Sequence, residues 1–171
     1  HDLMSGKLDA IVTNPINKKN IQSESFNFPG HTEYLTKKFG AEESLMIMTC
    51  HDIHIGIMTN HLSLAQVPKV ITKELILRKL KVMDNSLKRD FGIRMPKIAV
   101  LALNPHAGDR GLIGTEDESI VAPAIREAFD NGILAFGPYP ADGFFGNGSM
   151  RDFDGVMALY HDQGLIPFKL M

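Results

Sequence analysis

The sequence contains almost no cysteine and no long apolar run. Cys50 is the only cysteine among 171 residues, which excludes a disulfide within the chain and a cysteine-based zinc ribbon. Because Cys50 ends an apolar run over 45–50, we expect a buried thiol in a reducing compartment, and hence a cytoplasmic protein. No apolar run approaches the about 18 residues that span a membrane, and no signal peptide is visible, so we expect no membrane partner.

The sequence also lacks an excess of charge of either sign. Its formal net charge is -2, whereas a non-specific binder of nucleic acid or of an anionic membrane needs a basic face, so neither partner is expected. Hydrophobic residues make up 44% and charged residues 22%, as is usual for a globular domain. The length suits one substantial core or two small lobes.

Apolar periodicity predicts strands that alternate with helices. Strands are expected over 8–13, 45–50, 53–59, 97–103, 133–136 and 155–160, and helices over 32–39, 72–91 and 115–130. A very short polar link separates the second and third strands, which predicts an antiparallel hairpin. The order of elements favours an α/β fold with a mainly parallel sheet and this one hairpin.

Three residues carry further local predictions. Isoleucine at alternate positions in the hairpin predicts one buried face, which places His54 on the exposed face. Thr72 is expected to cap the helix over 72–91. Pro123 lies inside the helix over 115–130 and is expected to kink or split it.

The strand expected over 155–160 ends in four residues of special interest, His161, Asp162, Gln163 and Gly164. In open α/β sheets, ligands bind at the carboxyl ends of the strands. An imidazole beside a carboxylate at that edge can bind a metal or transfer a proton. This stretch is therefore the first candidate for a functional site.

Three histidines share one property, because His61, His106 and His161 each follow an expected strand in a loop. If those strands run in the same sense, the imidazoles converge at one edge and can hold a catalytic divalent metal. Their spacing along the chain is not a metal motif, and the alternative is three unrelated loop histidines. Asp162 and Asp142 are then candidates for orienting the imidazoles or for direct ligation.

A fourth histidine lies near the start of an expected helix. Thr32 can cap the helix over 32–39, which places His31 at its N-terminus, where free N–H groups attract an anion. The alternative is a loop histidine that contacts only water.

Several segments together resemble the motifs of the 4-hydroxythreonine-4-phosphate dehydrogenase family. They are Gly30-His31-Thr32-Glu33, Thr59-Asn60-His61-Leu62, Asn104-Pro105-His106-Ala107-Gly108, Pro140-Ala141-Asp142 and Tyr160-His161-Asp162-Gln163-Gly164. Residues 13–18 are similar to an early TGPxxK motif, with Asn14 in place of glycine. The order and intervals match through the whole chain. The resemblance implies an α/β fold of the isocitrate/isopropylmalate dehydrogenase type.

The same resemblance implies that 1–171 is the central fragment of a longer enzyme, without its N- and C-terminal parts, and no internal boundary is evident from the sequence. It implies a homodimer with active sites at the subunit interface. His61, His106 and His161 would be the ligands of a divalent metal (Zn, Mg or Co), drawn from both subunits.

The resemblance also implies roles around the substrate and a nucleotide cofactor. His31, Thr32 and Lys169 would contact the substrate. Asp162 or Asp142 would accept a proton or support a ligand histidine, and the sequence does not separate these roles. The cofactor would be NAD or NADP, but no residue within 1–171 is assigned to it.

The implied activity is oxidation and decarboxylation of 4-phosphooxy-L-threonine, in the synthesis of pyridoxal phosphate (vitamin B6). The nearest alternative is a paralogue that acts on a phosphorylated sugar acid, such as 4-phosphothreonate or 4-phosphoerythronate. Two alternatives from other classes are an inactive metal-binding fragment and a metal hydrolase that needs no NAD.

Overall fold

The computed structural model describes residues 2–17, 20–23, 26–28 and 30–171. The chain divides into two compact units, unit 1 (1–44) and unit 2 (45–171). Within the described ranges, no helix is both long enough and apolar enough to cross a lipid bilayer.

The described part of unit 1 contains one short helix and a cluster of aromatic rings. The helix is α1 (His31–Lys38). Its Tyr34 ring lies 5.1 Å from the Phe26 ring and 5.4 Å from the Phe28 ring, measured between centroids. Aromatic pairs at such separations stabilise beyond the area that they bury.

The strand expected over 8–13 is absent from unit 1, and that prediction is wrong. Leu8, Ile11 and Val12 remain 51%, 48% and 98% exposed, so this apolar stretch is not part of a core. β-Propensity mostly reflects packing against a neighbouring strand. The described residues offer this stretch no strand partner, so its composition alone does not make a strand.

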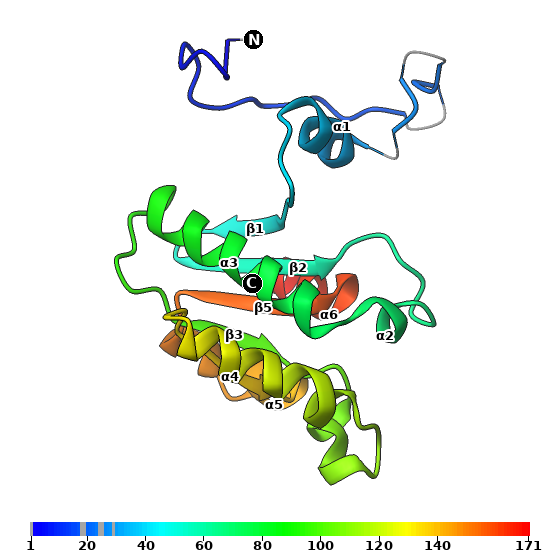
Figure 1. Ribbon diagram of the computed structural model, residues 1–171, viewed down its shortest axis with the longest axis vertical. Helices are drawn as coiled ribbons and strands as arrows, with labels where there is room; N and C mark the ends of the chain where they lie inside the picture. The colour runs from blue at the N-terminus through cyan, green and yellow to red at the C-terminus, as the bar shows by residue number, and fades with distance from the viewer. Residues whose placement is uncertain (1, 18–19, 24–25, 29) are drawn as a thin grey trace. The chain divides into compact units, whose positions relative to one another are not determined.

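Unit 2 is built on a five-stranded sheet in the order β1-β2-β5-β3-β4 (Figure 1). The strands are β1 (Met46–Cys50), β2 (Ile53–Thr59), β3 (Ile98–Leu101), β4 (Ala135–Tyr139) and β5 (Gly155–Tyr160). β1 and β2 form the expected antiparallel hairpin, and all other neighbours are parallel. Cys50 is exposed, so its expected burial is wrong. The reason is that β1 is an edge strand, and Cys50 is its last residue.

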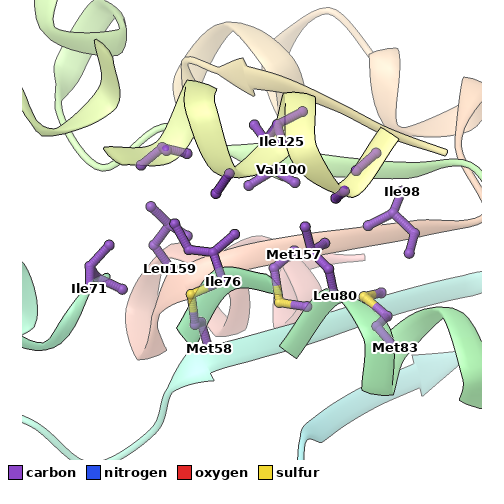
Figure 2. Packing of buried hydrophobic residues seen from close by; sticks show 14 of the residues in the cluster. Met58, Ile71, Ile76, Leu80, Met83, Ile98, Val100, Ile125, Met157 and Leu159 are labelled. Carbon is purple, nitrogen blue, oxygen red and sulfur yellow. The ribbon is translucent and has the colours of Figure 1, made fainter. Parts of the chain in front are cut away.

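Helices cover both faces of this sheet. They are α2 (Val67–Val70), α3 (Lys73–Arg89), α4 (Ala122–Asp130), α5 (Ala141–Gly146) and α6 (His161–Leu170). Successive residues of β5 alternate between two cores: Met157 packs with α3 and α4, whereas Ala158 packs with α5 and α6. Figure 2 shows the first core, in which Leu80 of α3 lies beside Met157 and Ile125 of α4 beside Val100.

The helix predictions in unit 2 are confirmed in their main features. The Thr72 hydroxyl accepts the N–H of Leu75 and so caps α3. Pro123 does split its helix, because a π-helical turn at Asp117–Val121 precedes α4. A π turn relaxes the backbone where proline cannot donate a hydrogen bond.

The prediction that His54 lies on the surface is wrong. His54 is only 6% exposed, and its ring lies 4.1 Å from the Phe91 ring, between centroids. β2 has a strand on each side, and its second face packs under α3, where a Cβ at Gly56 would lie 3.1 Å from the Met83 sulfur. Successive side chains of β2 therefore point to two buried faces of the sheet, and neither face is exposed to solvent.

His54 should make stability depend on pH. Burial lowers its pKa below 6.5, although the charges of Asp52 and Asp154 oppose the shift. Below pH 6.5 the unfolded chain then binds the proton more readily than the folded chain. The folded state therefore becomes less stable as the pH decreases. We expect the melting temperature of the wild type to fall more between pH 7 and pH 5 than that of His54→Leu. A steeper fall in the variant would contradict this assignment.

Candidate metal and substrate site

The strands that precede the three candidate histidines are neighbours in the sheet. β2, β5 and β3 lie side by side and run parallel, so their carboxyl ends share one edge (Figure 1). The common strand direction assumed in the metal hypothesis is therefore confirmed. His61 follows β2, His161 follows β5 and His106 follows β3.

Strand register brings two of the histidines together. Thr59 pairs with Tyr160, so His61 and His161 leave the sheet from adjacent positions on neighbouring strands. Their ring centroids lie 5.8 Å apart. A tetrahedral metal bound to one nitrogen of each ring at about 2.0–2.1 Å would place the centroids about 5 Å apart. Small side-chain rotations close that difference, so this pair fits a divalent cation.

Asp162 orients one of these imidazoles. The Nδ1–H of His161 donates to Oδ1 of Asp162 over 2.7 Å. An ionised carboxylate only accepts hydrogen bonds, so the proton lies on Nδ1 and the lone pair of Nε2 is left for a ligand. Carboxylates support metal-binding histidines in this way.

Asp142 shares a cavity with Asp162. The cavity has a volume of about 320 Å³ and lies between α5 and α6, with Tyr160 and Gln163 also in its lining. An adjoining cavity of about 250 Å³ is lined by His61, His161, Asp162 and Tyr160. Asp162 and Tyr160 line both cavities, so the cavity with Asp142 and the cavity with the imidazole pair are neighbours.

His106 begins a turn of a kind that the sequence did not predict. Residues 106–110 all have positive φ, between 43° and 81°, and only Gly108 among them is glycine. A left-handed conformation costs an L-residue about 1–2 kcal/mol. Such strain clusters at functional sites and persists only where surrounding contacts enforce it. His106 itself is exposed.

A single chain does not assemble the three histidines. Within the described part of the chain, no group of three His, Cys, Asp or Glu side chains is arranged to hold a metal. His106 therefore does not join His61 and His161 within one subunit. Two of the three candidate ligands are brought together, and the third lies on the next strand of the same edge.

The candidate substrate residues lie in both units. Lys169 is exposed in the last turn of α6 in unit 2. His31 is the first residue of α1 in unit 1. The expectation that Thr32 caps α1 is wrong, because Gly30 holds the cap position and Thr32 lies in the first turn. A glycine cap leaves the first N–H groups of α1 without a side-chain acceptor.

The sequence indicated a loop after β5, and this prediction is wrong. α6 begins at His161 directly, so His161, Asp162 and Gln163 form its first turn. Sequence reasoning gave no role to Gln163, Thr59 or Asp117. All three are buried polar side chains near the strand ends. A buried polar side chain is recognisable only once burial is known, although Thr59 and Gln163 both lie within segments that resemble family motifs.

The sheet and its edge define an α/β protein, a class in which ligands usually bind at the carboxyl ends of parallel strands. The model of one family, described as "Pyridoxal phosphate biosynthetic protein PdxA", matches residues 1–171. The chain therefore belongs to the PdxA family.

Several curated relatives are named 4-hydroxythreonine-4-phosphate dehydrogenase. The chain is 52% identical over 167 residues to 4-hydroxythreonine-4-phosphate dehydrogenase of Bacteroides thetaiotaomicron, covering 97% of this chain and 46% of that protein. It is 42% identical over 170 residues to the protein of that name from Sulfurihydrogenibium sp., covering 99% and 52%. The chain thus spans about half the length of the relatives that it matches.

Solved structures agree in fold. The structure of 4-hydroxythreonine-4-phosphate dehydrogenase from Klebsiella pneumoniae superposes with a TM-score of 0.91 at 36% identity, covering 99% of this chain and 51% of that one. This confirms the expected isocitrate dehydrogenase-like α/β fold. A terephthalate 1,2-cis-dihydrodiol dehydrogenase from Burkholderia xenovorans superposes with a TM-score of 0.78 at 29% identity, covering 99% and 53%.

Proposed function

We propose that the chain is the central part of a 4-hydroxythreonine-4-phosphate dehydrogenase. The enzyme would use NAD, or NADP, and a divalent metal to oxidise and decarboxylate 4-phosphooxy-L-threonine in the synthesis of pyridoxal phosphate. The observation that carries the proposal is the imidazole pair of His61 and His161, with Asp162 on one of them, at the carboxyl edge of the sheet. The relatives that share the name make this chemistry the natural one for the site.

The metal would be held by His61, His106 and His161, drawn from the two subunits of a homodimer. A shared site agrees with a single chain in which His61 and His161 meet and His106 does not join them. When bound, the cation would act as a Lewis acid toward the oxygen of the reacting carbon.

Asp142 and Asp162 would accept and donate protons during the reaction. The nucleotide cofactor would supply the hydride acceptor, and Asp142 or Asp162, which line one cavity, would accept the hydroxyl proton. Asp162 would instead support His161 if Asp142 takes the proton. Loss of carbon dioxide would leave the bonding electrons on the substrate carbon, and the aspartic acid that accepted the hydroxyl proton would return it to that carbon.

Charged groups elsewhere would hold the substrate's anionic groups. Lys169 supplies a mobile ammonium on α6. His31 and Thr32 lie in the first turn of α1, where backbone N–H groups favour phosphate or carboxylate.

The test is a substrate panel with the full-length protein. We expect NADH formation with 4-phosphooxy-L-threonine, loss of that activity after chelation, and its recovery when a divalent metal is returned. Metal binding without NADH formation from any substrate would instead support an inactive metal-binding protein. Turnover without NAD would support a metal hydrolase.

A second candidate activity is oxidation of a related hydroxylated acid. One structurally similar protein is a cis-dihydrodiol dehydrogenase, so proteins with this fold are named for different substrates. The panel should therefore include 4-phosphothreonate, 4-phosphoerythronate and a cis-dihydrodiol. Faster turnover of one of these than of 4-phosphooxy-L-threonine would reassign the substrate while leaving the metal site in place.

A further inference from the structure

Three buried polar side chains lie at the carboxyl edge, one for each strand end that carries a candidate histidine. Thr59 is 5% exposed, Asp117 1% and Gln163 8%. Burial of a polar side chain is unfavourable unless its hydrogen bonds are made. Each of the three makes hydrogen bonds to the backbone of a neighbouring segment, so each joins two pieces of the edge.

Thr59 joins the ends of β2 and β5. Its hydroxyl donates to the carbonyl oxygen of Leu159 over 2.7 Å. Thr59 lies two residues before His61, and Leu159 lies two residues before His161. The bond thus links the two backbones immediately before the imidazole pair.

Gln163 joins β5 to β3 where their ladder has ended. The last paired residues of these strands are Val100 and Met157. Beyond them, the Gln163 side chain accepts the N–H of Leu159 over 2.7 Å and donates to the carbonyl oxygen of Ala102 over 2.6 Å. Because Gln163 lies in the first turn of α6, these two bonds also fix the helix end that carries His161.

Asp117 anchors the segment that leads from β3 to His106. Its carboxylate accepts the backbone N–H of Leu103 over 2.6 Å and that of Asn104 over 2.9 Å. It also accepts the side-chain amide of Asn104 over 3.0 Å. The left-handed turn over 106–110 begins two residues later, so Asp117 fixes the base of a strained loop.

We infer that Thr59, Gln163 and Asp117 are positioning residues for the metal site, acting through His61, His161 and His106. This inference rests on the proposed function, because it assumes that the histidines bind a metal. The hydrogen bonds of the three positioning residues run to the backbone and, for Asp117, also to the Asn104 side chain, and none of these bonds runs to a candidate histidine. They set the distances between the strand ends. Mutation of groups that hydrogen-bond directly to metal ligands typically changes metal affinity 10- to 100-fold, and we expect an effect of the same order here.

Gln163→Met tests the inference, because methionine keeps the volume of the side chain and removes both hydrogen bonds. Cobalt(II) affinity is measured by calorimetry, and the site geometry by the visible spectrum of bound cobalt, in the full-length protein. We expect affinity to fall about 10- to 100-fold with a changed cobalt spectrum. Wild-type affinity and an unchanged spectrum in Gln163→Met would overturn the inference.

Leu87→Val is the matched control for general destabilisation. Leu87 is fully buried in α3 and contacts the start of β5, at the opposite edge of the sheet. We expect its melting temperature to fall while cobalt affinity and spectrum stay at wild-type values. An equal loss of affinity in Leu87→Val would show that Gln163 acts through stability alone, and would overturn the inference.

Thr59 provides a second pair of variants if Gln163→Met does not fold. Thr59→Val removes the hydroxyl at constant shape, and Thr59→Ser retains it. We expect Thr59→Val to weaken cobalt binding and Thr59→Ser to restore it; equal affinities in the two would overturn the inference. A wild-type protein that binds no cobalt would overturn the proposed metal site and the inference together, whereas unchanged binding in the variants overturns the inference alone.

Discussion

Replacing His161 by alanine is expected to remove most of the metal affinity and nearly all dehydrogenase activity of the full-length protein. His161 combines two properties at the carboxyl edge, since its ring faces that of His61 and its Nδ1–H is held by Asp162. Loss of a supporting partner alone costs about 10- to 100-fold in metal affinity. Loss of the ligand should cost more than that, and calorimetry with cobalt or zinc measures it.

The fold should survive this substitution. His161 is partly exposed at the first position of α6 and is a member of neither core cluster. The control is His51→Asn, which changes an exposed histidine of the β1–β2 turn to a residue that tolerates its φ of 50°. His51→Asn should bind metal as the wild type does. Full metal content in His161→Ala would remove this histidine from the site.

The elements that the sequence predicted well are those whose stability is local. Three such features are the hairpin of β1 and β2, the Thr72 cap of α3 and the apolar periodicity of that helix. Each is set by residues that lie close together in the sequence. The run over 155–160 was predicted for another reason: β5 is buried on both faces by distant segments, but such a strand is apolar throughout and is therefore visible in the sequence.

The failures share a different cause, which is dependence on distant segments. His54 is buried because α3 covers the second face of β2, and the sequence of the hairpin gives no indication of this packing. The stretch over 8–13 has strand composition but no partner among the described residues. Propensity in both cases is a weak prior that tertiary contacts override.

Part of the candidate site could also be predicted, because alternating strands and helices favour parallel strands whose carboxyl ends share one edge. The strand order, in which β5 lies between β2 and β3, was not predicted. The pairing of His61 with His161 needs the register between β2 and β5, which no local pattern supplies. The left-handed turn at His106 and the bridge made by Gln163 depend on hydrogen bonds to residues far along the chain. Their geometry is a property of the assembled edge.

The close approach of α6 to the sheet depends on one glycine, and Gly164→Ala is expected to destabilise unit 2 by about 1–3 kcal/mol or more. An added Cβ would lie 2.9 Å from the Cβ of Ala158 and 3.0 Å from Cγ2 of Ile55, and it would also collide with Ile57. The Ala158 Cβ cannot rotate away, because it is fixed to the β5 backbone. α6 must therefore shift outward and take His161 with it.

Gly143→Ala is the matched control for this effect. Gly143 lies in α5, and an added Cβ there would meet nothing within 4 Å. Alanine in a helix is favoured over glycine by about 0.5–1 kcal/mol, so Gly143→Ala should be neutral or slightly stabilising. Chemical denaturation of the full-length variants measures both effects. If Gly164→Ala proved as stable as Gly143→Ala and retained its metal affinity, α6 would not be held against β2 and β5 as closely as the structure indicates, and the position of His161 would not depend on that contact.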